Sequence, residues 1–290
     1  MNSLPPPSAG LTLPGSGYDV VGSIVLFNTS LAEVERAIRL FTAVPLKSHL
    51  CILDNSPVPT ALPAVDAAKV SYFHTGNNLG YGRAHNLAIR AAAGRARYSL
   101  VMNTDIDYAN DVVQRLVEFL DNRPSAGLAA PKVRYPDGSL QHVCRLLPTP
   151  GNLFLRRFLP GSELTRKFDH AYELRGWDHN SIANLPYFQG SFLLLRTGLC
   201  NKLGGFDERF FLYGEDIDLT RRLHAVSQTL YVPDVSITHE YRRFSSRGLK
   251  GTWIGIQNNA RYFNKWGWLF DAERDAINSR ALASIMGSAA

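Results

Sequence analysis

The 290-residue sequence predicts an α/β fold with a largely parallel central sheet. The main observation is a regular alternation, beginning at Asp19, of short apolar runs typical of buried strands with segments of helical periodicity. The apolar runs are VVGSIVLF, LCILD, VSYF and YSLVMN, and helical segments begin at Leu31 and near Arg83. Such alternation is typical of parallel strands joined by helices. A hydrophobic content of 45% and a charged content of 19% indicate one compact domain with extensions and exclude a disordered chain.

Local signals mark the ends of the first two helices. Ser30 followed by Glu33 forms a capping box for the helix that begins at Leu31. Gly94 directly follows RAHNLAIRAAA, and glycine is typical of the position just after a helix. We therefore expect helices from residue 31 and over residues 83–93.

The second half of the chain departs from this alternation. Beyond Pro131, a polar and basic stretch between residues 145 and 167 precedes the apolar run YFQGSFLLLR. We interpret this stretch as an insertion and not as a separate domain. Aromatic and basic residues then recur at helical spacing from Trp253 to Trp268, and a further helix is expected over Asp271–Ile285.

The composition limits the partners and the compartment. The chain has 31 Lys and Arg residues against 25 Asp and Glu residues, and the resulting net charge of +6 favours anionic partners such as phosphates or an anionic membrane surface. Cys51, Cys144 and Cys200 are far apart and lack Cys-x-x-Cys spacing. A disulfide framework or a zinc site is therefore not expected, and a reducing cytoplasm fits best.

The N-terminal segment MNSLPPPSAGLTLPGSG has no basic region followed by a continuous apolar core. We therefore expect residues 1–18 to be a disordered leader and not a signal peptide. No run of the sequence approaches the roughly 18 to 20 apolar residues that span a bilayer. Any association with a membrane is thus expected to be peripheral.

Polar residues follow the predicted strands at the edge where open α/β sheets bind their ligands. These residues are Phe27–Asn28, Asp54–Asn55 and Asn103–Asp107. The last group, in VMNTDID, offers the oxygen ligands that Mg²⁺ or Mn²⁺ takes together with substrate phosphates. Asp105 and Asp107 are equally typical of ordinary turns, so this motif alone does not establish a metal site.

A second group of acids, Glu215, Asp216 and Asp218, opens a helix in GEDIDLTRRL. Carboxylates are common in first helical turns because they offset the helix dipole, so a purely structural role is the alternative. The preceding stretch GSFLLLRTGLCNKLGGFDERFFLYGED predicts a strand, a short helix, a Gly204–Gly205 turn and an aromatic loop that ends at the acids. Such framing is typical of carboxylates held in a cleft.

These motifs together resemble the family-2 glycosyltransferases with the GT-A fold. ILDNS, GNNLGYGRAHNLAI, NTDID, GSFLLLR, GGFDERFFLYGEDIDL and a later His239 occur in the order and spacing of that family. The likeness extends from about Val20 to Lys265. Within the family, the NNxGxGxxxN loop, the Asn-x-Asp motif and FxxYxEDxDL are most similar to bacterial rhamnosyltransferases of surface-polysaccharide (O-antigen, lipopolysaccharide) assembly.

The resemblance implies a single Rossmann-like, mostly parallel sheet with helices on both faces and a C-terminal helical extension. It assigns residues 19–268 to the GT-A domain, with a nucleotide-sugar half over 19–107 and an acceptor half over 108–240. The basic insertion then falls on the acceptor side. Residues 241–290 would form a basic, aromatic loop and the C-terminal helices.

The resemblance also implies which residues bind the nucleotide-sugar. They lie at three strand ends, in the glycine-rich loop whose glycines permit a close approach, and in a basic loop that would close over the diphosphate. The expected contacts are Phe27, Asn28, Asp54, Asn55, Asn78, Gly80, Gly82, Asn86, Asn103, Thr104, Asp105 and Arg243. A helix-entry turn for the glycine loop and a solvated basic face around Arg243 are the structural alternatives.

The same comparison assigns the catalytic groups. Asp105 matches the second acid of the family's Asp-x-Asp motif and is expected to bind Mg²⁺ or Mn²⁺, with His239 as a further metal ligand. Asn103 replaces the first acid, so its amide is expected at the ribose. Asp216 matches the base that deprotonates the acceptor hydroxyl in an inverting displacement, and Glu215 is expected to orient the acceptor or support Asp216. A histidine that follows a strand is also often structural.

The implied reaction transfers a sugar from a nucleotide-sugar to a saccharide acceptor in bacterial surface-polysaccharide biosynthesis. The resemblance favours dTDP-L-rhamnose as the donor and a polyprenyl-diphosphate-linked acceptor, met peripherally at the inner face of the cytoplasmic membrane. A UDP-hexose donor and a noncatalytic sugar-nucleotide-binding module are the alternatives. A Rossmann-type oxidoreductase is disfavoured because FNTS, and not Gly-x-Gly-x-x-Gly, follows the first strand. No nucleic-acid partner is expected, and the sequence leaves the oligomeric state open.

Overall fold

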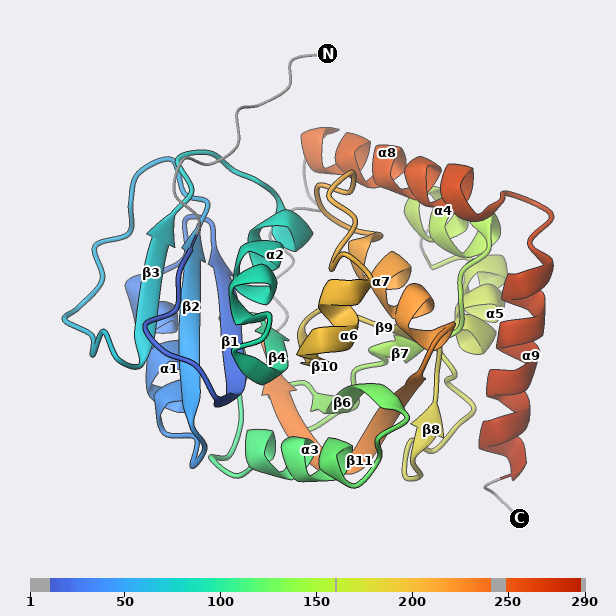
Figure 1. Cartoon of the computed structure of the whole chain (residues 1–290). Coiled ribbons are helices and arrows are strands. Elements are labelled where there is room, and N and C mark those ends of the chain that lie inside the picture. The colour runs from blue at the N-terminus through green and yellow to red at the C-terminus, as the bar shows by residue number, and fades with distance from the viewer. Residues whose placement is uncertain (1–10, 160, 241–248, 288–290) are drawn as a thin grey trace.

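The computed structural model describes residues 11–159, 161–240 and 249–287. Its centre is a nine-stranded sheet in the order β3-β2-β1-β4-β10-β6-β11-β5, with β8 paired to β11 (Figure 1). The strands of this sheet are β1 (Tyr18–Leu26), β2 (Ser48–Asp54), β3 (Val70–His74), β4 (Ala96–Met102), β5 (Ile106–Asp107), β6 (Ala126–Arg134), β8 (Ala183–Asn184), β10 (Phe192–Arg196) and β11 (Gln228–His239). The short strands β7 (Cys144–Arg145) and β9 (Tyr187–Phe188) pair with each other.

The predicted largely parallel sheet is confirmed. Strands β3, β2, β1 and β4 are parallel to one another, and β6 and β11 run in the same direction. β10 lies antiparallel between β4 and β6, and the short strands β5 and β8 are antiparallel to β11. The four apolar runs of the first half correspond to β1–β4. Because six strands share one direction, their carboxyl ends meet at one edge of the sheet.

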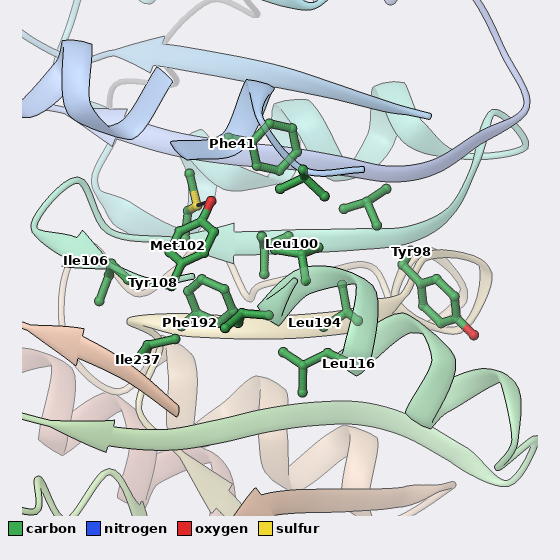
Figure 2. Packing of buried hydrophobic residues seen from close by; sticks show 14 of the residues in the cluster. Phe41, Tyr98, Leu100, Met102, Ile106, Tyr108, Leu116, Phe192, Leu194 and Ile237 are labelled. Carbon is green, nitrogen blue, oxygen red and sulfur yellow. Dashed lines mark hydrogen bonds between the residues drawn. The ribbon is translucent and has the colours of Figure 1, made fainter. Parts of the chain in front are cut away.

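Helices cover both faces of the sheet, as the sequence predicts (Figure 1). α1 (Leu31–Thr42) and α3 (Val112–Asp121) pack on one face, and α2 (Tyr81–Ala92), α6 (Thr197–Lys202) and α7 (Glu215–His224) pack on the other. Figure 2 shows the first face, where Phe192 and Leu194 of β10 lie among Leu100, Met102 and Ile237 of the neighbouring strands. The alternate residues of β10, Leu193 and Leu195, are buried against the second face.

The predicted helix signals match the structure. The Ser30 hydroxyl accepts a hydrogen bond from the backbone N–H of Glu33, which caps α1. α2 ends at Ala92, two residues before Gly94. Within the basic insertion, for which no secondary structure was predicted, the chain forms two helices, α4 (Pro150–Phe158) and α5 (Glu163–Tyr172), which contact each other.

Two helices follow at the C-terminal end, α8 (Leu249–Trp266) and α9 (Ala272–Gly287), close to the predicted segments (Figure 1). Asp218 of α7 is fully buried and binds α8 through the Lys265 ammonium at 2.6 Å and the Trp266 indole N–H at 2.9 Å. Arg221 of α7 forms a buried bidentate ion pair with Asp271 at 2.7 and 2.9 Å. The extension is therefore fastened to the helix that begins with the two predicted catalytic acids.

The N-terminal segment is partly packed on the domain. Residues 1–10 of the predicted leader lie outside the described residues, but Leu13 is buried beside α2 and the Arg95 guanidinium donates to its carbonyl oxygen. The predicted disorder therefore does not extend over residues 11–17. Among the described helices, none combines the length and the apolar character needed to cross a bilayer.

Candidate functional site

Asp105 and His239 meet at the sheet edge. Asp105 lies in the turn after β4, and His239 is the last residue of β11. The short strand β5 pairs antiparallel with the end of β11, with Ile106 opposite His239. This pairing brings Oδ1 of Asp105 to 3.3 Å from Nε2 of His239. The two predicted metal ligands are thus adjacent, although 134 positions separate them in the chain.

Gln141 fixes the orientation of the His239 ring. The Gln141 amide nitrogen donates to the His239 carbonyl oxygen at 2.6 Å, so its amide oxygen, 3.0 Å from Nδ1, accepts from the ring. Nδ1 is then the ring nitrogen that donates to Gln141, and Nε2 faces Asp105. A metal-binding histidine usually donates its other ring N–H to such a neighbour. The donor set therefore fits a divalent cation with mixed oxygen and nitrogen ligands.

The protein supplies only part of a coordination shell at this place. Within the described ranges, no group of three or more His, Cys, Asp and Glu side chains is arranged to hold a metal ion. A cation at Asp105 and His239 would therefore depend on further oxygens, such as those of a diphosphate. This dependence is expected of a site in which the metal and a nucleotide bind together.

Asn103 stands beside the pair. Its backbone N–H donates to the Ser191 carbonyl at 2.9 Å, which ties the end of β4 to the segment before β10. Its side-chain oxygen accepts from the Tyr81 hydroxyl at 2.9 Å, and its amide nitrogen lies 3.4 Å from Nε2 of His239. Thr104, next in the chain, is half-buried. Asn103 is therefore a neighbour of the predicted metal ligands and not an isolated turn residue.

The acid pair opens α7 at the other end of the site. Gly214, the N-cap residue, has a φ of 91°, and the backbone N–H groups of the first helical turn favour negative charge there. The Asp216 carboxylate accepts from the backbone N–H of Gly190 at 3.1 Å and of Ile217 at 2.9 Å. The Tyr187 hydroxyl donates to the same carboxylate at 3.4 Å. These donors stabilise the ionised form of Asp216.

The Glu215 carboxyl group has fewer hydrogen-bond donors around it than the Asp216 carboxylate. Its side chain is buried, and its Oε2 atom has no hydrogen-bond partner among the described residues. Burial raises the pKa of Glu215 well above its ordinary value, and the charge of Asp216 raises it further. Burial also raises the pKa of Asp216, but the backbone N–H groups of Gly190 and Ile217 oppose this effect. The pKa of both acids is thus raised, and Glu215, which has fewer donors, is the one that keeps its proton more readily.

Tyr81 and Gly190 join the two ends of the site. The Tyr81 hydroxyl lies 2.9 Å from the Asn103 side-chain oxygen and 2.6 Å from the Gly190 carbonyl oxygen. The N–H of the same Gly190 binds Asp216. Burial raises the pKa of Tyr81, and the neighbouring carboxyl groups of Glu215, Asp216 and Asp105 raise it further. Tyr81 therefore stays protonated between the two groups of acids.

The predicted nucleotide contacts at the first two strand ends divide into exposed and buried groups. Phe27 is 42% exposed, and Asn28 is exposed with a φ of 52°. Asp54, by contrast, is fully buried. Its carboxylate accepts from the backbone N–H groups of Ser56 and Thr60 and from a tyrosine hydroxyl. In the structure Asp54 shapes the turn beside the exposed Phe27 and Asn28, and its direct contact with the nucleotide stays a prediction.

Electrostatics support this structural role of Asp54. Burial alone would raise its pKa, but hydrogen bonds from Ser56, Tyr72 and Thr60 lower it to about 2. Asn55 is likewise buried, and its amide donates to the Gly80 carbonyl at 3.0 Å. The direct contact predicted for Asn55 likewise stays a prediction. Asn55 joins the second strand end to the glycine-rich loop.

The glycine-rich loop contacts the aromatic loop that leads to the acids. Gly80 has a φ of 83°, and a Cβ at this position would lie 2.2 Å from the Phe211 carbonyl oxygen. A Cβ on Gly82 would lie 2.7 Å from Cβ of Phe206. These two glycines were predicted to allow approach of the nucleotide. In the structure, the absence of side chains at Gly80 and Gly82 lets the protein's own segment 206–211 pack against the loop.

Asn86 reinforces this contact. Its side chain is buried, accepts from the Phe206 N–H at 2.8 Å and donates to the Phe206 carbonyl at 2.8 Å. Asn86 therefore holds the aromatic loop in place, and its contact with the nucleotide stays a prediction. Asn78 is exposed at the loop surface, where its side chain can meet a nucleotide. Its side-chain oxygen accepts a hydrogen bond from the Gly80 N–H. Arg243 lies outside the described residues.

Three comparisons with known proteins bear on the family and the fold of the chain. A model of glycosyl transferase family 2 matches residues 24–172, more than half of the chain. The chain belongs to glycosyl transferase family 2. The predicted family is thereby confirmed, and the acceptor-side acids lie beyond the matched range.

Among family-2 relatives, the chain is 32% identical over 187 residues to the N-acetylglucosaminyl-diphospho-decaprenol L-rhamnosyltransferase of Mycobacterium tuberculosis, covering 60% of this chain and 59% of that protein. It is 26% identical over 216 residues to the rhamnosyltransferase WbbL of Escherichia coli, covering 71% and 78% of the two chains. The chain thus spans less than two thirds of the length of the mycobacterial relative.

A solved structure of GalNAc-T7 with UDP, GalNAc and Mn²⁺ superposes with a TM-score of 0.62 at 14% identity, over 86% of this chain and 49% of that one. At this identity the likeness concerns the fold alone. Together with the family match, it confirms the predicted GT-A fold.

Several residues of the site were not found from the sequence. These residues contact partners that are distant in the chain, and they are Tyr81, Gly190, Gln141 and Tyr187. Tyr81 and Gly190, for example, are 109 positions apart. One local signal was the dipeptide Gly190–Ser191 directly before β10, which opens the motif GSFLLLR. Nothing in the local sequence distinguishes Gln141 from a surface glutamine.

We expect Gly80→Ala to destabilise the protein more than Gly76→Ala. Both glycines have positive φ, which costs roughly 1–2 kcal/mol for alanine. A Cβ on Gly76 would have nothing within 4 Å, whereas at Gly80 it would meet the Phe211 carbonyl. Gly80 also combines its φ with a ψ of −179°, a region accessible essentially only to glycine. Urea unfolding of both variants measures the difference, and equal losses would contradict the packing role.

We expect Glu215→Gln to stabilise the protein increasingly as the pH rises above about 4.3, the ordinary pKa of a glutamate. The unfolded chain ionises there, but the folded chain holds the Glu215 proton, so folding takes up a proton at a free-energy cost that grows with pH. Glutamine removes this cost. Thermal unfolding between pH 5 and 8 should show the melting temperature of the variant rising above that of the wild type.

Glu208→Gln is the matched control for this measurement. Burial would raise the pKa of Glu208, but hydrogen bonds from Arg90 and Asn86 lower it below its ordinary value. Its ionised form therefore stabilises the fold, and its replacement should lower the melting temperature over the same pH range. A melting-temperature difference for Glu215→Gln that does not depend on pH would show that Glu215 is ionised in the folded protein.

Proposed function

We propose that the chain is an inverting glycosyltransferase that transfers a sugar from a nucleotide-sugar to a saccharide acceptor. The observation that supports this most is that a pair of cation ligands and a possible catalytic base lie in one hydrogen-bonded site. Asp105 and His239 offer cation ligands at one end, and Asp216 offers an ionised carboxylate at the other, with Tyr81 and Gly190 between them. Sugar transfer from a diphosphate needs both a group that neutralises the leaving charge and a base for the acceptor.

At the first end, Asp105 and His239 would hold Mg²⁺ or Mn²⁺, which stabilises the negative charge that grows on the leaving diphosphate. Gln141 keeps Nε2 of His239 directed towards Asp105. The exposed ring of Phe27 and the exposed side chains of Asn28 and Asn78 are suited to contact the nucleoside. Arg243 keeps its proposed role at the diphosphate.

At the second end, Asp216 takes the proton of the acceptor hydroxyl while the hydroxyl oxygen forms a bond to the anomeric carbon. The bond from that carbon to the diphosphate oxygen breaks, and the nucleoside diphosphate leaves. Attack opposite the leaving group inverts the anomeric centre. Because Glu215 holds its proton, it supports Asp216 and orients the acceptor as a hydrogen-bond donor and not as a second base.

The relatives support a finer assignment of the substrates. Both are described as rhamnosyltransferases, and the mycobacterial one is named for an acceptor on a diphospho-decaprenol carrier. We therefore propose dTDP-L-rhamnose as the donor and a polyprenyl-diphosphate-linked saccharide as the acceptor. UDP-hexose is the alternative donor, favoured by the UDP bound in the GalNAc-T7 structure.

A lipid-linked acceptor requires contact with a membrane surface. The turn between α8 and α9 presents Leu269 and Phe270, which are 76% and 93% exposed. Trp268 beside them stacks on Phe154 of α4, with ring centroids 6.0 Å apart. Apolar side chains held outward on a rigid turn are typical of interfacial contact. We propose a peripheral position at the inner face of the cytoplasmic membrane, with residues 108–240 on the acceptor side.

A donor panel with three variants tests this function. With dTDP-rhamnose and UDP-sugars, Mn²⁺ and lipid-linked acceptors, we expect acceptor-dependent release of nucleoside diphosphate. Asp216→Asn should lower kcat about 10²- to 10⁴-fold while donor binding stays unchanged, whereas Asp105→Ala should weaken Mn²⁺-dependent donor binding. Asp107→Asn, at an exposed position two residues away, is the control and should resemble the wild type. Donor binding without turnover on any acceptor would instead favour a noncatalytic binding module.

A further inference from the structure

A cavity of about 380 Å³ lies between α4, α5 and α9, three helices that stand together in Figure 1. None of the predicted nucleotide, metal or catalytic residues lines it. Its volume is within the range typical of small-molecule pockets. The lining residues that matter most for its chemistry are mainly apolar, and they are Leu146, Leu147, Lys167, Phe168, Ala171 and Tyr172.

The amide side chains in the cavity wall are bonded to the protein itself. Asn278 of α9 exchanges two hydrogen bonds with the backbone of Leu147, at 2.8 and 2.9 Å. The Asn152 side chain of α4 accepts from the Thr149 hydroxyl at 2.7 Å and donates to the Phe168 carbonyl at 3.3 Å. A polar ligand would gain little from these groups, whereas an apolar ligand would displace water from the apolar side chains. An apolar group is therefore the occupant that fits the cavity.

An exposed apolar stripe of α5 leads into the cavity. Leu164, Phe168 and Ala171 follow one another at spacings of four and three residues, so they lie on one face of the helix. Leu164 and Phe168 are 49% and 39% exposed, and Ala171 is exposed as well. On the opposite side, α4 carries Phe154, which stacks on Trp268 at the turn proposed to contact the membrane. The cavity therefore opens on the part of the surface where an apolar chain would arrive from a membrane.

Tyr172 connects the cavity to the proposed base. Its ring stacks on the Tyr187 ring with centroids 6.4 Å apart, and the Tyr187 hydroxyl donates to Asp216. The Arg145 guanidinium lies 5.7 Å from the centroids of both rings, and the ammonium-bearing Lys167 stands in the cavity wall. Positive charge at these places favours an anionic group. The base, the cation and the apolar cavity thus follow the order of a sugar hydroxyl, a diphosphate and a hydrocarbon chain in a lipid-linked acceptor.

We propose that this cavity binds an isoprenoid segment of the acceptor's lipid carrier, with the diphosphate near Arg145 and Lys167 and the acceptor sugar at Asp216. This inference rests on the lipid-linked acceptor of the proposed function. The chain makes the same contacts in the ground state and in the transition state, so it increases the affinity for the acceptor and leaves the chemical step unchanged. The cavity accordingly selects lipid-linked saccharides over free ones.

Equilibrium binding of farnesyl diphosphate, a short isoprenoid probe, tests this inference without any turnover. Isopentenyl diphosphate carries the same anionic group on a single isoprene unit and is the reference. We expect the wild type to bind farnesyl diphosphate at least about tenfold more tightly than isopentenyl diphosphate. Ala171→Phe, which fills the cavity from an exposed helical position, should remove this difference. Ala283→Phe, at an exposed position of α9 outside the cavity lining, is the matched control and should bind both probes like the wild type.

Kinetics with a lipid-linked acceptor separate the inference from the proposed function. Ala171→Phe should raise KM for this acceptor about tenfold and leave kcat unchanged. Transfer and farnesyl diphosphate binding that Ala171→Phe does not affect would refute the inference and leave the proposed function standing. Farnesyl diphosphate binding that Ala171→Phe abolishes, in a protein that transfers no sugar, would support the cavity assignment and refute the proposed function. Equally tight binding of dodecyl phosphate would assign the cavity to membrane acyl chains and overturn the inference.

Discussion

The dipeptide Gly190–Ser191, just before β10, connects Asn103 and Tyr81 to Asp216 in the candidate site. The Ser191 carbonyl accepts from the backbone of Asn103, the Gly190 carbonyl accepts from Tyr81, and the Gly190 N–H donates to Asp216. A Cβ on Gly190 would lie 3.3 Å from the Tyr81 ring and 3.4 Å from Cβ of Asp216. This close approach is possible because β10 runs antiparallel between β4 and β6, so that its first residues reach the carboxyl ends of its neighbours.

A second constraint is the placement of negative charge. Three carboxyl groups, Asp105, Glu215 and Asp216, act electrostatically on the half-buried Tyr81, and their mutual repulsion would be costly if all were ionised. The structure limits the charge in two ways. Backbone N–H groups hold Asp216 as the anion, whereas Glu215 lacks comparable donors and keeps its proton. The remaining charge at Asp105 is placed where a cation can neutralise it.

Local patterns were enough to predict the framework of the protein. The apolar runs located β1–β4, and the polar residues after them located Asp105, because strand ends depend on neighbouring residues in the chain. The acid pair was found through its position at a helix start. Asp54, Asn55 and Asn86 were assigned to the nucleotide because a motif marks residues as functional without saying whether they face the ligand or the protein. Their burial depends on loops up to 122 positions away, which no local pattern encodes.

The central claim is that cation ligands at Asp105 and His239 and a base at Asp216 form one site. It is tested most directly by a crystal structure of the protein with Mn²⁺ and a nucleoside diphosphate, with the metal located by its anomalous scattering. The account predicts one Mn²⁺ peak in contact with Asp105 and His239, with the diphosphate completing its shell. It also predicts that the Asp216 carboxylate, still bound to the Gly190 N–H, faces the terminal phosphate from the far side of the space for the sugar. Mn²⁺ bound at Glu215 and Asp216, or a diphosphate bound away from Asp105, would contradict it.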